Sequence, residues 1–196
     1  MRQWQTIASA VPTIDLDAPS RIRGWRNREV VAHLTLQPIL LRRILRTASA
    51  REPRMKLSAN LDGTSSLADL IDVTARHDAE LGRLDFRRAV DDALPELRAS
   101  DLAVTVETVQ GSMVLVDYLI TRCVEAVVHG RDLVEPVEPD PTAEAITARA
   151  LLDALAERAP RLVRVAQDLP SREWIDVATG RRSCSGELAT AVPVMT

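Results

Sequence analysis

The sequence contains few aromatic residues and no long apolar segment. Phe, Trp and Tyr together make up 3% of the 196 residues. Leu, Val, Ile and Ala must therefore fill the core, which favours packed helices over an aromatic-rich sheet. No stretch approaches the roughly 18 uninterrupted apolar residues of a membrane span, and the N-terminal segment lacks the continuous apolar core of a signal peptide. We therefore expect a cytoplasmic protein with no membrane partner.

Cysteine, histidine and excess charge are also scarce. Two cysteines, Cys123 and Cys184, without any CxxC pair exclude a disulfide scaffold and a thiolate zinc finger. A net charge of −3 argues against a nucleic-acid partner. Neither a phosphate-binding glycine motif nor a GxSxG nucleophile motif occurs. The chemistry must then be sought around the three histidines, His33, His77 and His129.

The apolar pattern predicts a mainly α-helical chain. Residues spaced three and four apart predict helices over 1–11, 27–45, 66–84, 86–100, 112–134 and 142–158. Residues 49–64 are expected to be a polar loop, and the alternating, β-branched segment 103–111 a strand or extended connection. After residue 160, segments 162–169 and 173–179 suggest two short strands. We therefore expect a helical domain over 1–158 and a short α/β appendage over 159–196.

Local signals predict where several helices begin or break. Asn27 is the expected N-cap of the second helix, with Glu29 in its first turn. Pro38 should kink that helix or split it after Leu36. Ser65 or Ser66 is the expected cap of the third helix, and the pair at 111–112 is expected to open the long helix over 112–134.

A polar stripe on the long helix is the most informative feature. Glu125 and His129 are four residues apart and share one helix face. Tyr118, Arg122 and Asp132 extend this face, whereas the rest of the circumference is apolar. A buried carboxylate costs several kcal/mol unless it is paired or bound to a metal. Glu125 is therefore expected to have such a partner.

His33 lies in a second apolar helix, four residues after Glu29. Two histidines and one carboxylate from facing helices are the usual ligands of a catalytic zinc site with an open position. Simpler interpretations are a surface pair for Glu125 and His129 and a hydrogen-bonded core histidine for His33. His77 is most simply a helix-surface residue, and Cys123 a core thiol.

Two segments resemble one protein family. Residues 19–34 are similar to the opening motif of the mycothiol-dependent maleylpyruvate isomerase-like proteins, and residues 122–133 are similar to their second motif. The resemblance covers residues 15 to about 135. It implies a DinB/YfiT-like up-down four-helix bundle with a long crossover, and a divalent metal, usually zinc, on His33, Glu125 and His129. The first helix is shorter than in the family, and the C-terminal region is much shorter than the isomerase's sterol-carrier-like domain.

The resemblance implies a metal-dependent enzyme that uses a low-molecular-weight thiol, mycothiol, in an isomerase or thiol-transferase reaction on an electrophile. Glu29 and Asp132 are candidates to orient the imidazoles, and Arg122 is the candidate to receive an anionic substrate or to neutralise Glu125. The alternative is a non-catalytic, metal-stabilised bundle that binds a small ligand or a protein. Both a monomer and a homodimer stay open.

Overall fold

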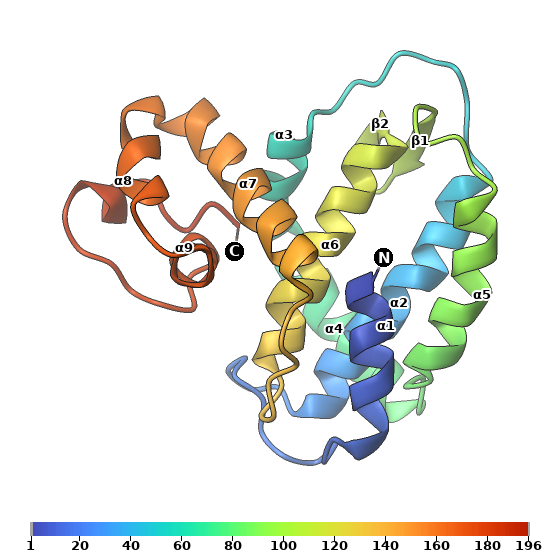
Figure 1. Ribbon diagram of the computed structural model, residues 1–196. Coiled ribbons are helices and arrows are strands. Elements are labelled where there is room, and N and C mark those ends of the chain that lie inside the picture. Colours follow the sequence, from blue (N-terminus) through green and yellow to red (C-terminus); the bar gives the residue numbers. More distant parts are fainter. Residues whose placement is uncertain (1, 196) are drawn as a thin grey trace.

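Four helices pack side by side in a closed ring: α1 (Arg2–Ala10), α5 (Phe86–Arg98), α2 (Asn27–Leu45) and α6 (Leu115–Asp132) (Figure 1). This computed structural model describes residues 2–195, apart from the side chains of residues 64 and 65. The crossover from α2 to α5 contains α3 (Leu57–Asp62), a 3-10 turn (Gly63–Leu67) and α4 (Ala68–Glu80), which packs on α2. The mainly helical fold class is confirmed.

The core of the bundle is formed by large apolar side chains from all four helices. Trp4 of α1 and Phe86 of α5 are both fully buried. They belong to one cluster with residues of α2 and α6, which include Val30, Leu34, Leu41, Leu115 and Tyr118. These residues recur at three- and four-residue spacing, so each helix buries one stripe against the others.

Helix α2 differs from the expectation in two details. It runs through Pro38 without being split, because Leu34 and Leu41 on either side of the proline are fully buried in the same core. Arg26, rather than Asn27, occupies the N-cap position. Asn27 instead is buried and connects distant segments, since its amide donates to the Asp15 carbonyl at 2.8 Å and accepts from the Val134 backbone at 3.1 Å.

A β-hairpin precedes α6. Strands β1 (Thr105–Thr108) and β2 (Gly111–Val114) are antiparallel, and Val106 pairs with Met113. The extended segment is therefore confirmed, but the long helix begins at Leu115 and not at residue 112. Burial of Val106 and Met113 on the bundle core stabilises the hairpin. Gly111, at a φ of 137°, allows the turn between the strands.

The expected loop over 49–64 and the expected cap of α4 are also corrected. Residues 57–62 form helix α3, whose Leu61 is buried against α6 and α7. Leu67 occupies the N-cap position of α4, and Ser66 bonds to the Gly63 carbonyl in the preceding turn. The side chain of Ser65 lies outside the described residues.

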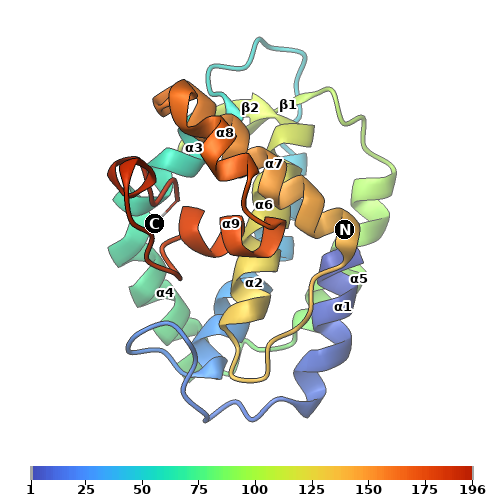
Figure 2. The same cartoon turned by 60° about the vertical axis from the view of Figure 1, so that its left-hand side comes forward.

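The C-terminal segment is helical, so both strands expected there are wrong. Helix α7 (Pro141–Arg158) is followed by a 3-10 turn (Pro160–Leu162), α8 (Val163–Gln167), α9 (Ser171–Ala178) and a 3-10 turn (Glu187–Thr190) (Figure 2). Trp174, Ile175 and Ala178 lie on one face of α9 and are buried. Apolar contacts with α7 at helical spacing therefore outweigh the β-propensity of Ile and Val.

These residues form a second apolar cluster, which we call the C-terminal core. It combines residues of α7, α8 and α9 with Val124, Val127 and Val128 of α6. The boundary expected between residues 158 and 159 stays a prediction.

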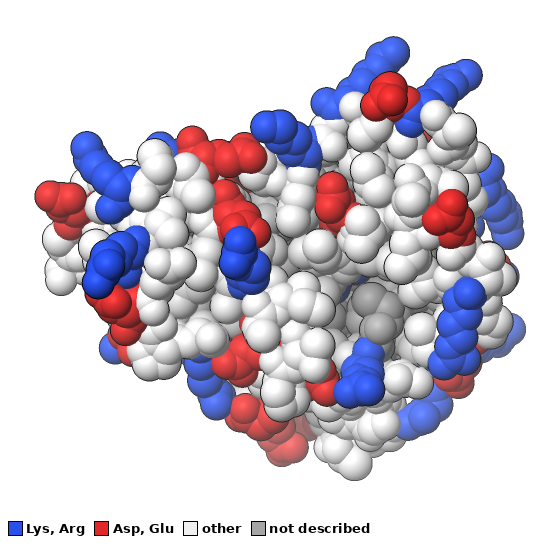
Figure 3. All heavy atoms as spheres, turned by 45° about the horizontal axis from the view of Figure 1, so that its top comes forward, with Lys and Arg blue, Asp and Glu red and all other residues white. Residues whose placement is uncertain are grey.

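The surface drawn in Figure 3 carries basic and acidic side chains interspersed around a hollow of mostly uncharged residues. Within the described part of the chain, no helix is both long and apolar enough to span a membrane.

Candidate metal centre

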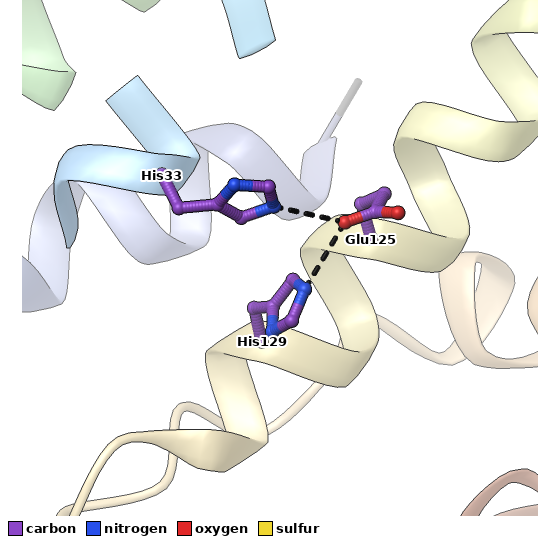
Figure 4. A group of neighbouring side chains, drawn as sticks. All are labelled: His33, Glu125 and His129. Carbon is purple, nitrogen blue, oxygen red and sulfur yellow. Dashed lines mark hydrogen bonds and ion pairs between the residues drawn. The ribbon is translucent and has the colours of Figure 1, made fainter. Parts of the chain in front are cut away.

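Helices α2 and α6 bring together the three residues expected to bind a metal. His33 projects from α2, and Glu125 and His129 project from successive turns of α6 toward it (Figure 4). We call these residues the His–Glu cluster. The four-residue spacing on α6 places Glu125 directly beside His129, and contact between the helices supplies His33 from a position 92 residues away in the sequence.

The donor atoms of the His–Glu cluster converge on one point. Nε2 of His33 and Nε2 of His129 each lie 3.1 Å from the same oxygen of Glu125. The three donor atoms all lie within 4.8 Å of one another. His33 and Glu125 are only 6% and 5% exposed. Two imidazole nitrogens and one carboxylate in this arrangement fit a divalent metal such as zinc and leave a coordination position open.

A buried carboxylate contacts the ring nitrogen of His129 that faces away from Glu125, and an arginine in turn contacts this carboxylate. Nδ1 of His129 lies 2.9 Å from Oδ2 of Asp132, which is 1% exposed. Arg181, from the segment after α9, donates to both oxygens of Asp132 at 2.8 and 3.2 Å. The one-turn spacing predicts the contact of Asp132. Arg181 was missed, because no sequence pattern links it to a residue 49 positions earlier.

Glu29 does not have the role expected for it. Its carboxylate accepts a hydrogen bond from the Arg26 backbone at 2.6 Å and so caps the first turn of α2. The ring of His33 instead has the Gln37 amide at 3.3 Å, one turn later. Two rings lie beside it: the ring of His129, with centroids 4.8 Å apart, and the ring of Trp25, with centroids 6.0 Å apart. The Trp25 indole donates to Asp72 at 2.6 Å. Gln37 and Trp25 were not identified from the sequence.

Arg122 lies beside the His–Glu cluster. Its guanidinium donates to Oε1 of Gln37 and to the Thr121 hydroxyl, and it lies 4.9 Å from the centre of the Tyr118 ring. Over residues 2–195 Arg122 has no carboxylate within ion-pair distance, Glu125 included. The expected neutralisation of Glu125 therefore does not occur through direct pairing.

The contacts within the cluster separate the pKa values of its members. Burial lowers the pKa of His129, but hydrogen bonds to Asp132 and Glu125 outweigh it and raise this pKa to about 9. Burial likewise opposes ionisation of Glu125, but hydrogen bonds from His129 and His33 hold its pKa well below the usual range. Burial dominates at His33 and lowers its pKa. In the metal-free protein at neutral pH, a protonated His129 therefore balances an ionised Glu125.

A cavity of about 260 Å³ adjoins the cluster. His33, Glu125 and Arg122 line its inner end, and its walls come from α2, α4 and the turn of the hairpin. A ligand in this cavity can therefore reach the donor atoms.

The remaining candidates lie elsewhere. His77 is exposed in the last turn of α4. Cys123 is half-buried on the other side of α6, where its thiol lies 3.7 Å from the Ala143 carbonyl. Neither belongs to the His–Glu cluster.

The fold and the cluster define a helical bundle in which two histidines and one glutamate are placed so that they could hold a metal ion. A family model described as the mycothiol maleylpyruvate isomerase N-terminal domain matches residues 1–134, and the chain belongs to this family. A comparison with curated proteins gives no match.

Solved structures show the same fold. The crystal structure of the mycothiol-dependent maleylpyruvate isomerase is similar to this chain at 15% identity with a TM-score of 0.56, covering 79% of this chain and 65% of that one. A histidine-to-alanine mutant of that isomerase is similar at 16% identity, with the same TM-score and coverage. The match thus spans less than two thirds of the isomerase, and it establishes the DinB-like helical fold alone.

Proposed function

We propose that this chain is a metal-dependent enzyme that uses a low-molecular-weight thiol, mycothiol by family membership, in an isomerase or thiol-transferase reaction. The convergence of His33, Glu125 and His129 at the inner end of a cavity carries the proposal. A non-catalytic bundle would need only the buried donor atoms, whereas here two of the three residues also face the cavity. That access favours the enzyme over the alternative of a metal-stabilised binding module.

In this proposal His33, Glu125 and His129 are the metal ligands. Their donor set suits zinc, which when bound supplies a positive charge that lowers the pKa of a thiol at its open position. Glu125 contributes one negative charge, so the loaded site retains a net positive charge that favours a thiolate. Asp132 accepts a hydrogen bond from Nδ1–H of His129 and thereby leaves Nε2, which faces Glu125, available to bind the metal.

Arg122 has a binding role in the proposal. Its guanidinium faces the same cavity as Glu125 and has no carboxylate partner in the described chain. It can therefore hold an anionic group of the electrophile while the thiolate attacks.

Cobalt substitution tests the proposal. Cobalt-loaded protein should develop a sulfur-to-metal charge-transfer band when mycothiol is added, with a pH midpoint below the free-thiol pKa of about 8.5. His33→Ala should abolish the band, because it removes the donor on α2. Cys123→Ser and Cys184→Ser are matched controls and should leave the band unchanged, since neither thiol lies in the cluster.

A band that forms without added thiol, or that disappears with either cysteine, would contradict this assignment. Cobalt binding without any band in the presence of thiol would favour the non-catalytic, metal-stabilised bundle.

A further inference from the structure

We propose that the cavity beside the His–Glu cluster binds a substrate with an apolar body and a single carboxylate, and that Arg122 receives the carboxylate. The inference rests on the proposed function for the identity of this ligand as the electrophile. The binding of such a molecule can be measured separately from metal chemistry.

The walls of the cavity are mainly aliphatic. Helix α2 contributes Leu36, Leu40 and Ile44, and α4 contributes Leu70, Ile71 and Ala75. Apolar walls stabilise a ligand in proportion to the apolar surface that leaves water. A small and wholly polar substrate would gain nothing from these aliphatic side chains.

The entrance of the cavity is apolar as well. Leu70 is 59% exposed and Val109, in the hairpin turn, is 81% exposed, although both also line the cavity. Exposed apolar side chains that are continuous with an apolar cavity are typical of a ligand-binding groove. The entering body is therefore expected to be apolar along its length.

The inner end of the cavity carries one charge that the described residues leave without an ion-pair partner. Asp78, also on the wall, pairs with Arg83 at 2.7 Å, and Glu125 is held by the two imidazoles. Arg122 has only neutral acceptors, on Gln37 and Thr121. A planar guanidinium presents several donors that match a carboxylate. A single guanidinium in an apolar cavity fits a monocarboxylate better than a dicarboxylate or a neutral molecule.

Calorimetric titration of zinc-loaded protein tests the inference with octanoate, octan-1-ol and maleate as probes. Octanoate should bind at least about tenfold more tightly than either of the others, because it alone satisfies both the walls and Arg122. Arg122→Gln should lower octanoate affinity about 10- to 100-fold and leave octanol affinity unchanged. Arg149→Gln, which removes an exposed arginine of α7, is the matched control and should change neither.

A second variant tests the apolar part. Leu70→Asp should weaken both octanoate and octanol, since it places a charge at the entrance, and its exposed position keeps the fold intact. Unchanged binding in Leu70→Asp would overturn the assignment of the apolar body. Equal affinity for octanol and octanoate, or tighter binding of maleate, would overturn the assignment of a single carboxylate.

The metal separates this inference from the proposed function. Repeating the titration without zinc should retain the difference between parent and Arg122→Gln. Octanoate binding that requires zinc and ignores Arg122→Gln would mean that the carboxylate binds the metal, and would overturn the role of Arg122. If the protein fails to bind zinc but still binds octanoate through Arg122, the binding site stands while the metal-dependent function falls.

Discussion

The two buried faces of α6 have opposite chemistry. The face toward α2 carries Glu125 and His129, whereas the other face carries Val124, Val127 and Val128 in the C-terminal core. Apolar side chains are stabilised by burial alone, but buried ionisable groups are destabilising unless each has a partner. One face of the helix therefore stabilises the fold, and the other holds the buried ionisable groups of the His–Glu cluster.

The two faces are nevertheless connected. Asp132 lies in the last turn of α6, behind His129, and it is held by Arg181 from the C-terminal segment. Arg131, next to Asp132, pairs with Asp176 of α9 at 2.7 Å. The C-terminal segment contributes to the C-terminal core and, through Arg181 and Asp132, also contacts His129 of the His–Glu cluster. This segment lies beyond the residues that match the family model.

Substitution of His129 is expected to have the largest effect on zinc affinity and to leave the apolar face of α6 unchanged. His129→Ala should lower zinc affinity by about 100- to 1,000-fold, if the three ligands share roughly 10 kcal/mol of binding free energy. The fold should persist, because both hydrophobic clusters are unchanged and the two buried carboxylates keep Arg181 and His33 as partners. Zinc titration and circular dichroism would measure the two properties, and unchanged zinc affinity would contradict the ligand assignment.

The converse substitution changes the C-terminal core, against which the apolar face of α6 packs. Leu151 of α7 is fully buried in the C-terminal core. Leu151→Ala should lower the free energy of unfolding by about 2–5 kcal/mol through loss of burial and creation of a cavity. Zinc affinity of the folded protein should remain within about twofold, which isothermal titration can show. A parallel loss of zinc affinity would mean that the two faces are not separable.

The sequence predicts much of this contrast, because both faces follow helical periodicity. The spacing of Glu125, His129 and Asp132 places them on one side of a helix, and the apolar neighbours of His33 indicate burial. The strands expected after residue 160 were wrong because Ile175 and Val177 favour strands locally, whereas their contacts with α7 are long-range. Glu29 was misassigned because a shared helix face does not reveal that a carboxylate in the first turn caps the helix.

The polar face of α6 should also differ from the apolar face in its dependence on pH. His129 has a pKa of about 9 in the metal-free protein, above its unfolded value near 6.5. Its proton therefore stabilises the metal-free fold fully below about pH 6.5, and this stabilisation is lost as the pH rises through 9. Zinc must displace the same proton, so apparent zinc affinity should rise about tenfold per unit between pH 6 and 8.

Calorimetry in buffers of different ionisation enthalpy measures this proton release. Burial lowers the pKa of His33, and hydrogen bonds from the two histidines hold the pKa of Glu125 well below its usual range, so most of the released proton should come from His129. Zinc affinity that does not change with pH would show that His129 is already neutral in the metal-free protein.

The smallest expected effect tests the connection between the faces. Arg181→Gln removes the charge that holds Asp132 but leaves the hydrogen bond between Asp132 and His129 in place. Loss of a direct contact to a metal-binding histidine typically costs about 10- to 100-fold in affinity, and Arg181 acts one contact further away. We therefore expect zinc affinity to fall by roughly three- to tenfold. Arg182→Gln, which breaks a pair with Glu173 at the surface, is the matched control and should leave zinc affinity unchanged. Equal effects of the two substitutions would mean that the C-terminal segment only stabilises the fold, and that the polar face of α6 is oriented by the bundle alone.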